Sequence, residues 1–90
     1  MNHSKFPNLR ELEKAVVEVL KSQNGPLTNE LITKRVVEML RIPTELTELV
    51  HKNAQTELEY RLAWARTGAR KRQLIVRIGP KTWKSMDSSD

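Results

Sequence analysis

The stretch from Gln55 to Met86 places the tightest constraint on the fold, because a helical pattern is followed at once by the pattern of a tight β-hairpin. Thr56 and Glu59 have the spacing of a capping box, in which the hydroxyl accepts from a first-turn amide and the carboxylate accepts from the amide of the cap residue. We therefore expect a helix to begin at Glu57. Its apolar residues recur at helical spacing and form one stripe: Leu58, Leu62, Ala65 and Ala69.

The opposite side of this helix is expected to face solvent, and it is rich in Lys and Arg. The residues turned away from the stripe are Glu59, Tyr60, Ala63, Arg66, Thr67, Arg70 and Lys71. A narrow apolar seam with a broad basic face suits the major groove of DNA, where polar side chains reach base edges and cations meet phosphates. The helix is therefore a candidate recognition helix.

After Gln73 the pattern changes to that of β-strands. Residues 74–78 are rich in β-branched side chains, and residues 82–86 can return as the partner strand. Gly79 and Pro80 mark the turn between them. A basic helix that runs directly into a short hairpin is the outline of a winged helix.

The distribution of charge favours a polyanionic partner. The net charge is +5, but residues 1–54 are nearly balanced, with eight basic and seven acidic side chains, whereas residues 55–90 hold eight basic and four acidic ones. Such segregation points to a polyanion more firmly than the total does. The alternative is that the basic face of the helix is only solvated and binds no partner. The following absence of acidic residues argues against this alternative. Between Arg61 and Lys84 there is no Asp or Glu, and the cations are Arg61, Arg66, Arg70, Lys71, Arg72, Arg77, Lys81 and Lys84.

The upstream residues are expected to form a scaffold that begins with two helices. Asn8 can cap the first helix with Glu11, and Thr28 or Asn29 can cap the second, which runs to about Leu40 before Pro43 stops it. The side chains expected to face inward are Leu9, Leu12, Val16, Val19 and Leu20 in the first helix and Leu31, Ile32, Val36, Met39 and Leu40 in the second.

Shorter segments connect these helices to the basic helix. Leu27 is expected to make a brief extended contact with the hairpin. Thr44 can cap a short third helix that carries Leu46, Leu49 and Val50. Residues 51–55 are then expected to form a loop, and such a loop lies close to DNA in a helix-turn-helix protein.

These arguments give a set of candidate DNA contacts. Arg66 and Arg70 are assigned to phosphates or guanine, where Arg offers a bidentate fork. Arg61 is left open between an ion pair with a scaffold carboxylate and a phosphate contact. Trp64 and Trp83 are expected to pack in the core. The predicted DNA-binding residues are Lys52, Asn53, Gln55, Tyr60, Ala63, Arg66, Thr67, Arg70, Lys71, Arg77, Lys81 and Lys84, of which the last three belong to the hairpin.

The same residues resemble a known family. Tyr60–Thr67, Leu74–Ile75 and Trp83–Lys84 resemble the N-terminal domain of Mrr-type restriction system proteins, in which an Arg-apolar-small-Trp-Ala-Arg-Thr run precedes a Leu-Ile strand and a Trp followed by Arg or Lys. The match covers the last third of the chain. The departures are Gly68 for a bulky residue, Ala69 for Leu, and Arg72–Gln73 for a small pair.

The resemblance implies a winged-helix module that directs a nuclease to its target in a methylation-dependent restriction system. In full-length family members a PD-(D/E)XK-type nuclease domain follows this module, and nothing in these residues matches it. Catalysis is poorly supported, because there are no Cys, two His and no recognisable catalytic or metal-ligand spacing. We therefore expect neither enzymatic activity nor a cofactor or metal.

The sequence thus predicts a mainly α, α+β, winged helix-turn-helix domain of about four helices and a two-stranded wing over residues 1–86. Residues 87–90 are read as a disordered tail or a truncated linker. The predicted partner is double-stranded DNA, with a nuclease domain or a homodimer left open. The chain has no membrane-length apolar run and no signal peptide, so a cytoplasmic location is expected. Two alternatives remain, a stand-alone transcription regulator and a protein-interaction winged helix.

Overall fold

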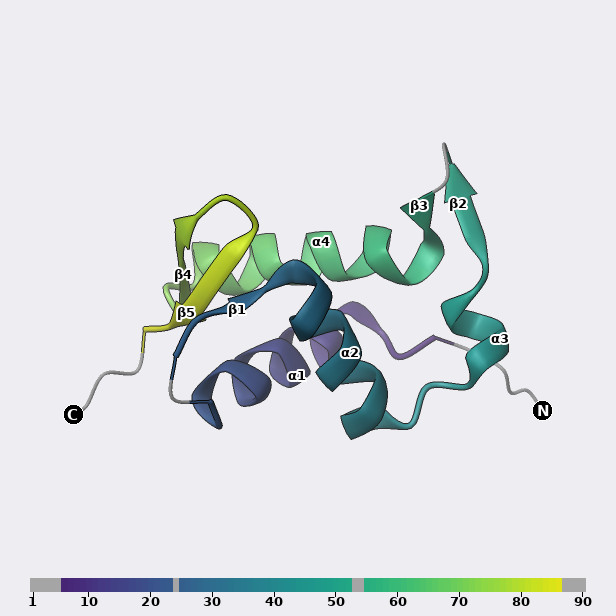
Figure 1. Cartoon of the computed structure of the whole chain (residues 1–90), viewed down its shortest axis with the longest axis horizontal. Helices are drawn as coiled ribbons and strands as arrows, with labels where there is room; N and C mark the ends of the chain where they lie inside the picture. Colours follow the sequence, from purple (N-terminus) through teal and green to yellow (C-terminus); the bar gives the residue numbers. More distant parts are fainter. Residues whose placement is uncertain (1–5, 24, 53–54, 87–90) are drawn as a thin grey trace.

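The computed structural model describes residues 6–23, 25–52 and 55–86 of the chain (Figure 1). Within these ranges the fold is of mixed α+β class and mostly helical, with four helices, a three-stranded antiparallel sheet and a second antiparallel pair of strands, as the predicted class requires. The helices are α1 (Leu9–Lys21), α2 (Asn29–Leu40), α3 (Thr44–Thr47) and α4 (Glu57–Lys71). The strands are β1 (Leu27–Thr28), β2 (Val50–Lys52), β3 (Gln55–Thr56), β4 (Ile75–Gly79) and β5 (Thr82–Ser85).

Both predicted capping boxes are confirmed. Asn8 Oδ1 accepts from the Glu11 amide at 2.8 Å, and the Glu11 carboxylate accepts from the Asn8 amide at 2.9 Å. At the start of α4, Thr56 Oγ1 accepts from the Glu59 amide at 3.0 Å while Glu59 Oε1 accepts from the Thr56 amide at 3.3 Å. These bonds satisfy amides that a helix leaves without a partner, so α1 and α4 begin where their sequences predict.

The core lies between α1 and α4, which pack side by side (Figure 1). The predicted stripe of α4 is confirmed, because Leu58, Leu62, Ala65 and Ala69 are all buried. Gly68 serves this packing. A β-carbon there would overlap the carboxylate of Glu13 from α1. Glu13 is buried, and its Oε1 lies 3.2 Å from Nε of Arg72, the residue that follows α4. The helix runs through Gly68 without a break.

The sheet joins the hairpin to the segment before α2. β5 is its central strand, with β4 on one side and β1 on the other. Leu27 of β1 pairs with Trp83 of β5, so the predicted extended contact of Leu27 is confirmed. The turn between β4 and β5 contains Lys81 with a φ of 52°, a left-handed conformation.

Several apolar positions were predicted to face inward and do not. The stripes expected on α1 and α2 were wider than the surfaces these helices bury. In α2 only Ile32 and Val36 are buried, Leu40 is half-buried, and Leu31 and Met39 are exposed. The prediction that Thr44 caps α3 was also wrong, since the extended Pro43 takes the cap position and Thr44 is the first helical residue. The residues predicted to face inward and found exposed are Leu9, Leu31 and Met39. The prediction that the third helix carries Leu49 and Val50 was wrong as well, because α3 ends at Thr47 and Val50 belongs to β2.

The segment before α4, which was predicted to be a loop, contains two short strands. Val50 of β2 pairs with Thr56 of β3, the residue that caps α4, so a short hairpin is attached to the first turn of that helix. In Figure 1 this hairpin and the β4–β5 hairpin rise at opposite ends of α4. Within the described ranges, no helix has the length and apolar character needed to cross a membrane.

Candidate nucleic-acid interface

The outer face of α4 carries five of the twelve predicted contact residues. Thr67, Arg70 and Lys71 are exposed, as expected, and Tyr60 and Ala63 are half-buried. The hydroxyl of Thr67 donates to the Ala63 carbonyl at 3.0 Å, so that proton is already used within the helix. The side chains on this face that remain most open to a partner are therefore those of the last turn.

Arg66 is not on the outer face, and this prediction was wrong. Only 9% of it is exposed, and its guanidinium lies over the Trp83 ring, 6.0 Å from the ring centroid. At about 100° per residue, Arg66 lies roughly 70° from the middle of the buried stripe, which turns it toward β5. Desolvation lowers the pKa of Arg66, and the nearby charge of Glu59 raises it in part. An arginine keeps its proton at neutral pH even so.

Trp83 is the core anchor that the sequence predicts. It is 8% exposed, and its indole N–H donates to Asn29 Oδ1 at 2.8 Å. The backbone N–H of Asn29 in turn donates to the backbone carbonyl of Lys81 at 2.9 Å. Since Asn29 is the first residue of α2, these two bonds fix the β4–β5 hairpin to α2 while Arg66 holds it to α4.

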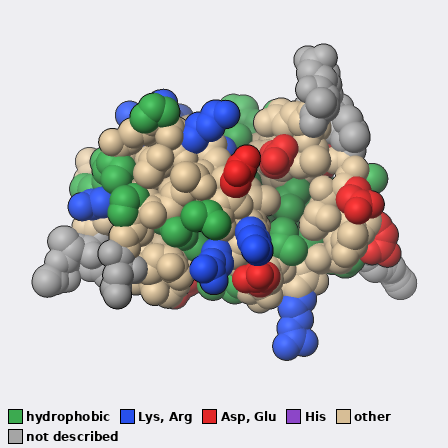
Figure 2. All heavy atoms as spheres, in the orientation of Figure 1, with side chains coloured by type: hydrophobic (Ala, Val, Ile, Leu, Met, Phe, Trp, Pro, Cys, Tyr) green, Lys and Arg blue, Asp and Glu red, His purple; other side chains and the backbone are tan. Residues whose placement is uncertain are grey.

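A groove of about 550 Å³ lies where these three elements meet. We name it the α2–α4 groove. It contains two cations, Arg66 and Lys81, and two carboxylates, Glu30 and Glu59. Figure 2 likewise shows acidic and basic side chains interspersed on this face of the molecule. The lining residues are Thr28, Asn29, Glu30, Thr33, Gln55, Glu59, Arg66, Pro80 and Lys81.

The β4–β5 hairpin presents three exposed cations, as predicted. Lys84 pairs with Val76 and Arg77 pairs with Trp83, so the two cations extend from opposite faces of the hairpin. Arg77 Nε also donates to the Gly79 carbonyl at 3.2 Å, and Lys81 lies in the turn. A surface that contacts all three must therefore wrap around the hairpin.

The other flank of α4 differs from the prediction in its tryptophan. Trp64 is 54% exposed and does not pack in the core. It lines a depression of about 230 Å³ next to Leu9 and Tyr60. Its position is roughly 130° from the middle of the buried stripe at 100° per residue, which is nearly opposite the core.

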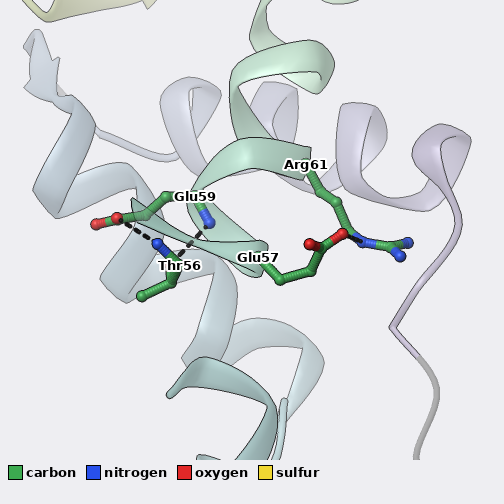
Figure 3. A network of polar contacts seen from close by, with 4 residues as sticks. All are labelled: Thr56, Glu57, Glu59 and Arg61. Atoms are coloured by element: carbon green, nitrogen blue, oxygen red, sulfur yellow. Dashed lines mark hydrogen bonds and ion pairs between the residues drawn. The ribbon is translucent and has the colours of Figure 1, made fainter. Parts of the chain in front are cut away.

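Arg61, left open between two roles, forms an ion pair. Its Nε lies 2.8 Å from Glu57 Oε2, a carboxylate of its own helix rather than of the scaffold (Figure 3). Its guanidinium also lies over the Phe6 ring, 4.6 Å from the centroid. Sequence reasoning missed this contact, because nothing in the pattern placed the segment before α1 beside α4.

The predicted contacts before α4 are only partly described. Gln55 is exposed in β3 and lines the α2–α4 groove. Lys52 belongs to β2, but its side chain and the whole of Asn53 lie outside the described residues. Sequence reasoning missed four groove residues, Asn29, Glu30, Thr33 and Pro80. The expected contact of Leu27 with the hairpin was the signal that could have found them, because it places the start of α2 beside the hairpin.

Two further findings concern metal binding and similarity to known proteins. In the described part of the chain, no cluster of three or more His, Cys, Asp or Glu could hold a metal ion. A scan against protein-family models and searches of curated proteins and of solved structures return no match.

Proposed function

We propose that this chain is a winged helix-turn-helix domain that binds double-stranded DNA, with α4 as the recognition helix and the β4–β5 hairpin as the wing. One observation carries the proposal: the last turns of α4 and the hairpin form a basic end with no acidic residue between Arg61 and Lys84. The exposed cations of this basic end are Arg70, Lys71, Arg72, Arg77, Lys81 and Lys84. Cations that neutralise phosphates release counterions, which supplies much of the affinity for DNA.

The acidic residues of α4 determine which end approaches the duplex. Glu57 and Glu59 both lie in the first turn of α4, where they would repel phosphates. Arg70 and Lys71 lie in the last turn, next to the hairpin. We therefore orient the duplex against the C-terminal half of α4 and the wing.

The biological setting follows from the resemblance to Mrr-type proteins. The module spans residues 1–86 and directs a nuclease domain or partner in a cytoplasmic, methylation-dependent restriction system. It carries no cleavage chemistry of its own. A stand-alone transcription regulator would share these features and differ in whether the gene continues into a nuclease.

The proposal is tested by fluorescence-anisotropy titration of a mixed-sequence duplex of about 20 base pairs at low and moderate salt, with heparin as a generic polyanion. We expect salt-dependent binding that favours the duplex. Arg70→Ala should weaken it and reduce the slope of log K against log salt by about one unit. Lys14→Ala is the charge-matched control, because Lys14 is an exposed cation of α1 outside the basic end.

The opposite result would favour a protein-interaction module. If the wild-type chain does not bind duplex at low salt, or if Arg70→Ala and Lys14→Ala reduce the slope equally, the basic end is not a DNA site. One observation supports this second candidate, namely the exposed apolar surface formed by Trp64 and Leu9, which has the character of a protein contact.

A further inference from the structure

Arg66 is buried, and no residue that the structure describes accepts a hydrogen bond from its guanidinium. It carries five N–H donors. No hydrogen bond or ion pair joins it to any other residue that the structure describes, and its neighbours are the face of the Trp83 ring and the charge of Glu59. A buried charged donor that is left unsatisfied carries the full desolvation penalty of its charge. Such a group in a groove indicates a missing acceptor.

The first turn of α2 also lines this groove, through Thr28, Asn29 and Glu30. The Asn29 amide donates to the Lys81 carbonyl, and the Leu31 amide donates to Thr28 Oγ1. The amide of Glu30, which lies between them, has no acceptor among the described residues. The N-terminus of a helix of 12 residues also carries a partial positive charge that favours anions.

The charges around the groove limit what kind of anion it accepts. Lys81 is an exposed cation at its edge, but the carboxylates of Glu30 and Glu59 also line it. Two cations and two carboxylates leave no net formal charge, so a dianion gains little attraction. A singly charged group can ligate Arg66 with less repulsion from the carboxylates.

We propose that the α2–α4 groove binds a phosphodiester, whose two free oxygens accept from the guanidinium of Arg66 and the amide of Glu30. Arg is suited to this role because its planar fork binds phosphate oxygens in a bidentate manner. The groove can bind a phosphodiester whether or not the chain binds duplex DNA. If the proposed function holds, the phosphodiester belongs to the DNA backbone and Arg66 contacts it from a buried position.

The test is a ¹H–¹⁵N NMR titration with dimethyl phosphate, compared with sodium chloride and sodium sulfate at equal ionic strength. We expect saturable shifts of the Glu30 amide and the Arg66 Nε–H, with weaker binding of the sulfate dianion. Arg66→Met should weaken dimethyl phosphate binding by roughly tenfold or more, because it removes charge-assisted hydrogen bonds. Lys14→Met should leave binding unchanged.

Arg66→Lys keeps the charge but lacks the fork, so it provides a second variant if Arg66→Met does not fold. It should bind dimethyl phosphate more weakly than the wild type. The proposal is overturned if the Glu30 and Arg66 signals do not move, if chloride moves them equally, or if both Arg66 variants bind like the wild type.

A duplex titration of the same variants identifies the source of the phosphodiester. Weaker duplex binding by Arg66→Lys places the DNA backbone in the groove. Dimethyl phosphate binding by a wild-type chain that does not bind duplex would retain the site and reject the proposed function.

Discussion

The two tryptophans lie on opposite flanks of α4 and have opposite environments. Trp83 is 8% exposed, and it makes contacts with β1, α2 and Arg66. Trp64 is 54% exposed, and it lines the depression next to Leu9 and Tyr60. The general tendency of aromatic side chains to be buried applies to the first and not to the second.

The difference shows that angular position outweighs residue type in so small a domain. Trp83 sits on a strand, where alternation with Thr82 and Lys84 turns it inward. Trp64 sits nearly opposite the buried stripe of its helix, and no layer formed by the described residues covers that side. The exposed flank is thus free for a partner, and the buried flank holds the fold together.

Trp83→Ala should have the largest effect on stability. Replacing it removes a large buried side chain and leaves Asn29 Oδ1 without its donor, so we expect a loss of about 3–5 kcal/mol in the free energy of unfolding. Urea unfolding followed by circular dichroism measures this. A loss no larger than that of Trp64→Ala would remove the contrast between the two flanks.

Arg66→Ala should rank second. The arginine packs on Trp83 by its stem as well as its charge, so truncation should cost about 1–3 kcal/mol of stability. Arg66→Met keeps the volume and removes the desolvated charge, and should recover most of that loss. Equal losses in the two variants would mean that charge rather than packing holds the hairpin to α4.

Gln73→Gly should raise stability by up to about 1 kcal/mol. Gln73 joins α4 to β4 with a φ of 63°, a conformation that glycine adopts without a steric penalty. Thermal unfolding should show the gain, and Gln73→Ala is the matched control that should not. A gain in both variants would assign the effect to the side chain instead of the backbone.

Trp64→Ala should have the smallest effect, within about 1 kcal/mol, because much of the side chain is already in solvent. The same urea experiment measures it. The variant should remain folded while any partner that uses this flank binds more weakly. A loss of about 3 kcal/mol would instead indicate core packing of the kind that large-to-small substitutions disrupt.

Local patterns correctly predicted the starts of α1, α2 and α4 and the β4–β5 hairpin. The capping boxes at Asn8 and Thr56 and the turn at Gly79 and Pro80 depend on residues that lie a few positions apart. The width of each buried face was not predictable in this way, because it depends on how many elements cover a helix. Arg66 illustrates the difference, since its burial requires the position of Trp83, which is distant in sequence.

The candidate site was predictable only in its charge. The cations of α4 and the hairpin were identified from the sequence, but the α2–α4 groove joins residues from Thr28 to Lys81 that no local pattern connects. The β2–β3 hairpin was missed for a similar reason. Two- and three-residue strands carry too few alternating positions to distinguish them from a loop.

The two bonds of Asn29 have a consequence for local opening of the molecule. Its side chain holds the indole of Trp83 and its amide holds the carbonyl of Lys81, so the hairpin cannot separate from the body without also releasing the first turn of α2. The two elements should therefore exchange their amide hydrogens as one cooperative unit. A partner that binds the hairpin would therefore also slow the opening of the first turn of α2, because Asn29 connects the two elements.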